Sequence, residues 1–303
     1  MASADDGLKN EAFREALAEA LVGSSARLES LLARYGGLPS AKPNMRLAAA
    51  FGAELANVSR PVAKLLHRLS ANEALEDTAE AYLPVAAAHA WAALIRVGKD
   101  VENAWSELAD IASDERKPVM LGVHDALLQL AVREGGADTL VERADEWLQI
   151  EEREIRYGAI GAAIEVLGDA NVLSGCTDHP ALFAFLSRVL DEMADAPRSA
   201  SRSTLRRRVM TALPRTLAGV ITTFDGGDEA PIWFRGECAR AQDEDMRQVL
   251  SDTIVRLRQS PTGQRGSVAD GLRAELEASA KPLRHAARVR PGTNRGKHTR
   301  KIR

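Results

Sequence analysis

Apolar residues recur along most of this chain at intervals of three and four positions, the spacing of one face of an α-helix. A clear early example is the series Leu17, Leu21, Leu28, Leu31 and Leu32. No segment shows the sustained alternation of apolar and polar residues that is typical of a half-buried strand. We therefore predict an all-α protein in which strands are absent or trivial.

Prolines and glycines indicate where these helices begin and end. Pro43 precedes the apolar run that starts at Met45, and Pro61 follows Ser59, so we expect both prolines in or beside a first helical turn. Gly98, Gly135 and Gly168 stand where the amphipathic patterns stop. Helix ends often take a left-handed residue, and we expect these glycines to supply it.

Four of the predicted helices repeat at an interval of 37 residues, beginning near Met45, Tyr82, Val119 and Arg156. At this offset two sets of mostly small residues superpose. The first set is Ala48, Val85, Gly122 and Ala159. The second set is Gly52, His89, Ala126 and Ala163, in which the histidine is the exception. Shorter amphipathic segments at 62–69, 101–111 and 140–150 lie between the repeating helices.

Two antiparallel helices in roughly 37–40 residues is the period of a helical solenoid, in which each hairpin buries its apolar face against the next. The segment 113–119, continuing into 126–130, resembles the HEAT repeat in its acidic residue, its early proline and its later Ala-Leu pairs. The resemblance extends well over 40–170 and loosely to about 258. It implies a HEAT-like, armadillo-like α-solenoid of about six to seven helix pairs. A compact, non-repeating helical bundle is the alternative.

Changes in composition divide the chain into three parts. We assign 1–258 to the solenoid. The segment 259–280 starts as a polar linker with Pro261 and Gly263, and a short helix is predicted from 268 to 278. The segment 281–303 is basic and has hardly any apolar residue after Pro291, so we predict a flexible, disordered tail.

Charge is unevenly distributed along the chain. The net charge is −3, from 40 basic and 43 acidic residues, but nine of the basic residues and none of the acidic ones lie in 281–303. This asymmetry predicts an anionic partner for the tail: RNA or DNA, an acidic protein or an anionic membrane surface. A solubilising tail without a specific role is the alternative. The candidate anion-binding residues there are Arg284, Arg288, Arg290, Arg295, Lys297, Arg300, Lys301 and Arg303.

A second basic segment lies between residues 196 and 224, with six arginines and no acid. Its apolar positions predict a helix from about Ser203 to Thr223. At 100° per residue, Arg208 and Arg215 project from one flank of that helix and Arg207 projects outward. Arg206 falls on the opposite flank.

These four arginines, Arg206, Arg207, Arg208 and Arg215, allow two interpretations. If their flank lines a groove of the solenoid, it would bind phosphate or carboxylate groups of a partner. Alternatively, the arginines pair with acids of adjacent repeats, such as Glu192 or Asp195, or are solvated.

Metal and cofactor chemistry have little support in the sequence. The cysteines Cys176 and Cys238 provide neither a disulfide framework nor a metal quartet. Cys176 and His179 are close in sequence, but they lack the second ligand pair that zinc requires. We predict no metal, no cofactor and no catalytic residue.

Motifs of nucleophilic and phosphate-binding enzymes are absent from the sequence: there is no Gly-x-Ser-x-Gly, no glycine-rich loop with lysine and no HExxH. Some HEAT-like proteins are DNA glycosylases that use Trp, Asp and Arg in a basic groove. The resemblance makes Trp147 beside Asp145, or Trp233 near Arg235, the residues to inspect for such an activity. Trp105 and Trp147 occupy apolar positions of corresponding helices, however, which predicts core packing.

The first 25 residues lack the basic, apolar and small-residue series of a secretory signal. The longest uncharged apolar stretch, 81–95, contains a proline and a histidine and is shorter than the roughly 18 residues of a bilayer span. We expect a cytoplasmic protein without a membrane span. The predicted function is a non-enzymatic scaffold or adaptor for a protein partner. The alternative is a nucleic-acid-binding solenoid that contacts phosphates through the Arg206–Arg215 helix and the tail.

Overall fold

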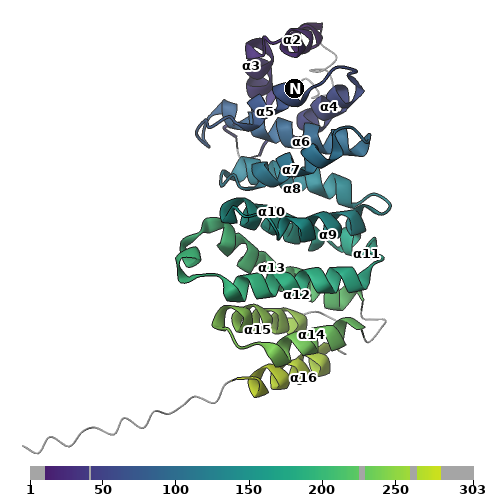
Figure 1. Cartoon of the computed structure of the whole chain (residues 1–303), viewed down its shortest axis with the longest axis vertical. Coiled ribbons are helices and arrows are strands. Elements are labelled where there is room, and N and C mark those ends of the chain that lie inside the picture. Colours follow the sequence, from purple (N-terminus) through teal and green to yellow (C-terminus); the bar gives the residue numbers. More distant parts are fainter. Residues whose placement is uncertain (1–10, 41, 225–228, 260–264, 281–303) are drawn as a thin grey trace, which may run out of the picture.

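The computed structural model describes residues 11–40, 42–224, 229–259 and 265–280. Within these residues it contains fifteen α-helices, two short 3-10 helices and no strand, so the predicted all-α class is confirmed. The helices follow one another in chain order from one end of an elongated stack to the other (Figure 1). The helix hairpins therefore form a solenoid and not a bundle around one shared centre.

Six helices form what we call the first row, in which each packs against the next along the stack. They are α4 (Met45–Asn57), α6 (Leu83–Arg96), α8 (Lys117–Ala131), α10 (Arg153–Leu167), α13 (Thr204–Thr223) and α15 (Glu244–Gln259). In α6 every residue from Leu83 to Leu94 is buried. Uniform burial of this kind is expected of a helix that has neighbours on several sides.

Six other helices form the second row and pack against helices of the first. They are α5 (Ala63–Ser70), α7 (Val101–Ala112), α9 (Gly136–Trp147), α12 (His179–Asp195), α14 (Glu229–Arg240) and α16 (Arg265–Ala278). Two further helices, α2 (Glu11–Leu21) and α3 (Ala26–Tyr35), precede the two rows at the N-terminal end of the described chain. Three short elements lie in the connections between helices of the two rows: η1 (Ala79–Tyr82), α11 (Ala170–Ser174) and η2 (Arg198–Arg202).

The 37-residue repeat corresponds to direct contact between successive first-row helices. A Cβ atom placed on Gly122 would lie 2.8 Å from Cγ1 of Val85, which is 37 residues earlier. The same interval separates Gly52 from His89, whose carbonyl oxygen would lie 2.6 Å from a Cβ on that glycine. Small residues at these positions therefore allow the helices to approach closely, as predicted from the repeat.

One predicted helix start is confirmed, that of the helix at Met45, and another needs correction. α4 begins at Met45 because the Asn44 side chain caps it by accepting the Leu47 amide at 3.2 Å, which leaves Pro43 outside the helix. α5 begins at Ala63, since the Val62 carbonyl accepts the first helical hydrogen bonds, so Pro61 precedes the first turn.

The glycines behave differently from one another at the helix ends. Gly98 and Gly135 adopt the expected left-handed conformation, with φ of 71° and 68°. Gly168 follows α10 with φ of −76°, so the prediction of a left-handed residue there is wrong. Its helix end is closed instead by backbone bonds from its own amide.

The C-terminal part of the stack continues past residue 258. The predicted helix at 203–223 is α13, with Ser203 as its N-cap and Pro214 in its interior. The predicted short helix is α16, which packs against both α14 and α15. The tail 281–303 lies outside the described residues.

The core is built from aliphatic side chains with few aromatic ones. Trp105 and Trp147 are both buried and meet edge to face, with ring centroids 5.9 Å apart, so their predicted place in the core is confirmed. His89 is buried among the alanines of α6. None of the helices in the described ranges is both long and apolar enough to span a bilayer.

Candidate functional site

A groove of about 840 Å³ lies over four first-row helices, α8, α10, α13 and α15. Its floor is largely apolar and includes Met120 and Leu121 of α8 and Leu205 and Ala212 of α13. Its charged side chains are Lys117, Glu165, Arg207, Arg208, Arg215 and Arg256. We call this feature the basic groove.

Two of the four predicted arginines of α13 are held in internal ion pairs. Arg208 meets Glu165 of α10 in a bidentate contact, with Nε and Nη2 at 3.0 and 2.6 Å from the two carboxylate oxygens. Arg206 donates to the Asp245 carboxylate and to the Met193 carbonyl, both at 2.7 Å. These pairs link α13 to its neighbours on both sides in the stack.

Arg206 requires a correction. It is only 6% exposed, so its guanidinium is not available to an external anion. Arg206 and Arg208 both pair with acids of adjacent repeats, which is the structural alternative considered in the sequence analysis. The acids are not the predicted Glu192 and Asp195. Glu192 pairs with Arg156 at 3.0 Å, and the acids that the α13 arginines reach are Asp245 and Glu165.

The other groove cations are solvent-exposed. Arg207 makes only long contacts within its own helix, to the Ser203 carbonyl at 3.4 Å and the Thr204 hydroxyl at 3.3 Å. Lys117, Arg215 and Arg256 are exposed and have no hydrogen-bond or ion-pair partner among the described residues. Since Arg208 and Glu165 neutralise each other, the basic groove carries an excess of four positive charges.

This local excess contrasts with the composition of the rest of the protein. Residues 1–280 contain 31 basic and 43 acidic side chains, a balance of −12. A positive groove in an acidic body concentrates a field that attracts anions. Lys117 and Arg256 were not predicted as site residues, because nothing in their local sequence shows that α8 and α15 line the same groove as α13.

Cys176 and His179, the two potential zinc ligands that are close in sequence, make structural contacts with protein side chains. The Cys176 thiol lies 3.2 Å from a carboxylate oxygen of Asp138, and burial together with that carboxylate raises the pKa of the thiol to about 12. His179 packs against Phe224 with centroids 4.1 Å apart. In the ranges that the structure describes, no group of three or more His, Cys, Asp or Glu side chains could hold a metal ion.

The residues considered for glycosylase chemistry lie outside the basic groove. Trp147 is in the core, and Asp145 pairs with Arg188 through Nε at 2.6 Å. Trp233 stacks on Phe183 at 4.9 Å and donates its indole N–H to Ser187 at 2.9 Å. These contacts account for the two tryptophans and for Asp145 as structural residues.

The eight predicted cationic residues of the tail, from Arg284 to Arg303, lie outside the described part of the chain. No protein-family model matches this sequence, and no curated protein matches it. A designed armadillo repeat protein, YIII(Dq)4CqI, is similar in structure, with 16% sequence identity and a TM-score of 0.38 over 89% of this chain and 100% of that one. The packing of successive hairpins within this chain by itself gives it the architecture of an α-solenoid.

Proposed function

We propose that this protein is a non-enzymatic interaction scaffold whose basic groove binds an acidic segment of a protein partner. The observation that carries the proposal is that Lys117, Arg215 and Arg256 come from three different helices, face one groove and lack partners among the described residues. Arginines are well suited to such a site because the guanidinium forms paired hydrogen bonds with a carboxylate.

The floor of the groove favours a protein segment over a nucleic acid. Met120 and Leu121 provide apolar surface on which aliphatic side chains can pack between carboxylates. The described lining residues include no Phe, Tyr or Trp, so the imidazole of His124 is the one ring of the groove on which a base could stack. The basic tail would act in the same cytoplasmic complex as a second weak attachment that speeds association.

Binding of synthetic peptides to the full-length protein tests this proposal. Fluorescence anisotropy would be measured with a labelled glycine–glutamate peptide at about 50 and 200 mM salt. We expect binding that weakens at the higher salt and falls about tenfold in the double variant Arg215→Glu, Arg256→Glu, because two charges are reversed.

Arg235→Glu is the matched control, since Arg235 is exposed on α14 and does not line the groove. It should leave the affinity within about twofold of wild type. Absence of binding at low salt, or equal loss in the control, would overturn the proposal. Groove-dependent binding of generic duplex DNA or RNA in place of the peptide would overturn it in favour of the nucleic-acid alternative.

A further inference from the structure

A second cavity, of about 620 Å³, adjoins the basic groove at the start of α8. The two share Lys117 and Leu121, so they lie next to each other on the surface. The other walls of the second cavity come from the loop between α3 and α4, with Leu38 and Pro43, and from the loop between α5 and η1. We call this cavity the leucine pocket.

The loop between α5 and η1 displays an unusually exposed apolar residue. Leu75 is 72% exposed at the edge of the leucine pocket, and Leu121 opposite it is 37% exposed. Two exposed leucines that line the same cavity form an apolar surface whose contact with water is unfavourable. Such patches on folded proteins commonly mark sites of interaction.

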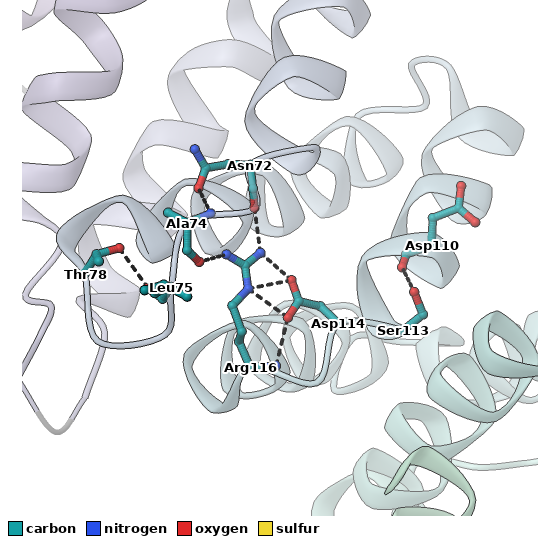
Figure 2. Close-up of polar contacts among 8 residues, drawn as sticks. All are labelled: Asn72, Ala74, Leu75, Thr78, Asp110, Ser113, Asp114 and Arg116. Atoms are coloured by element: carbon teal, nitrogen blue, oxygen red, sulfur yellow. Dashed lines mark hydrogen bonds and ion pairs between the residues drawn. The ribbon is translucent and has the colours of Figure 1, made fainter. Parts of the chain in front are cut away.

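This loop is held in place by Arg116, as Figure 2 shows. The Arg116 guanidinium donates to the carbonyls of Asn72 at 2.7 Å and Ala74 at 2.6 Å while it is paired with Asp114. Within the loop, the Thr78 hydroxyl donates to the Leu75 carbonyl at 2.8 Å. Leu75 is therefore presented by a backbone that is already ordered, which reduces the entropy cost of binding.

Charge differs between the two ends of the leucine pocket. On the loop side, Glu76 and Asp77 are exposed and have no ion-pair partner within the described chain. On the α8 side, the cation Lys117 lines both the leucine pocket and the basic groove. An occupant complementary to both ends carries a cation next to its apolar side chain and carboxylates beyond it.

We infer that the leucine pocket anchors the acidic segment bound by the basic groove: an extended protein segment with a basic residue beside a leucine-like side chain, followed by carboxylates. The inference rests on the proposed function and adds to it an apolar anchor at one end of the bound segment. From α8 to α15 there are three helix spacings of roughly 8–10 Å, which an extended chain of about eight residues covers at ~3.3 Å per residue.

The test uses labelled peptides of about nine residues and the full-length protein. One peptide carries Lys-Leu at its N-terminus followed by glycine–glutamate repeats, and another carries the reversed sequence, because either chain direction fits the inference. A third has Gly-Gly in place of Lys-Leu. We expect one of the two Lys-Leu peptides to bind about tenfold more tightly than the Gly-Gly peptide, an advantage that Leu75→Ser removes.

Two further variants sharpen the result. Val22→Ser is the matched control, because Val22 is also 72% exposed but lies outside the pocket, and it should retain the advantage. The double variant Glu76→Lys, Asp77→Lys should weaken the Lys-Leu peptide and strengthen a Glu-Leu peptide. The inference is overturned if all acidic peptides bind wild type within twofold of one another, or if Leu75→Ser changes nothing. In either case, binding that still depends on Arg215 and Arg256 would leave the proposed function standing.

Discussion

Gly52 on α4 lies against the backbone of His89 on α6, 37 residues further along the chain, so closely that a side chain on the glycine would overlap the His89 carbonyl. The obstacle is backbone, which cannot move aside as the end of a flexible side chain can. The contact therefore sets how near two successive repeats can approach.

Gly52→Ala should lower the free energy of unfolding by about 1–3 kcal/mol, since overpacking against backbone outweighs the gain of ~1 kcal/mol in helix propensity. Urea denaturation followed by circular dichroism measures the change. Gly236→Ala on α14 is the matched control, because a Cβ there meets nothing within 4 Å. The control should be neutral or stabilising, and equal destabilisation of both variants would contradict the close-approach argument.

Arg116→Ala should release the loop between α5 and η1. The change leaves the Asn72 and Ala74 carbonyls without their donor, and Asp114 keeps the amide of residue 116 but loses its ion-pair partner. We expect a loss of about 2 kcal/mol and faster amide hydrogen exchange in residues 72–78. Arg116→Lys keeps the charge, but a single ammonium group cannot contact both carbonyls and the carboxylate as the planar guanidinium does. We therefore expect a smaller loss of stability than in the alanine variant. Unchanged exchange in the alanine variant would show that the loop is ordered by other contacts.

Asp138 joins α9 to the loop before α12. Burial alone would raise its pKa, but hydrogen bonds from the Thr177 hydroxyl, the Asp178 amide, the Cys176 thiol and the Thr177 amide outweigh that effect and lower the pKa to about 2. Because the folded-state pKa is below the unfolded value, this carboxylate stabilises the fold above about pH 4, and its contribution is lost as the pH falls towards 2.

Asp138→Asn should therefore cost about 1 kcal/mol at pH 7, a figure reduced by solvent screening of a partly exposed group. The difference from wild type should shrink between pH 4 and pH 2. Unfolding by urea at several pH values measures it. A difference that is constant over this range would show that the charge of Asp138 is irrelevant and only its shape matters.

His89 should make the stability of the protein fall as the pH is lowered from about 6.5 to 4. Burial lowers its pKa to about 4, against the raising effect of the Asp125 carboxylate, while Arg96 lowers it further. Its Nε2 lies 3.6 Å from Asp125 and has no hydrogen-bond partner within the described chain. The unfolded state binds the proton in this range and the folded state does not, so protonation favours unfolding.

The slope expected from this residue is at most that of one proton, on the order of 1 kcal/mol per pH unit, between those values. His89→Ala, which introduces the residue found at the corresponding positions Ala126 and Ala163, should remove that part of the slope even if a cavity lowers the absolute stability. Stability measured by urea at pH 7, 6 and 5 gives the comparison. Parallel curves for variant and wild type would contradict the assignment.

The arrangement of the helices could be predicted to a large extent from the sequence. The 37-residue interval and the small residues at Gly52 and Gly122 indicated which helices touch, because each side chain's place on a helix depends only on its position in the chain. The start of α5 was misplaced by the proline pattern, since that helix begins at Ala63, after Pro61, with Val62 as its N-cap. Leu75 gave no signal at all, because its exposure depends on a loop held by Arg116 from a later repeat.

By itself the sequence determined that this protein is helical, that its hairpins repeat, and that Arg208 and Arg215 share a flank of α13, all of which follow from a local period. Only the tertiary structure decided that Arg208 is neutralised by Glu165, 43 positions away, while Arg215 stays exposed beside Arg256 and Lys117. The reason is physical: an ion pair depends on distance in space, and the residues that compete for each charge belong to helices whose contact no local pattern specifies.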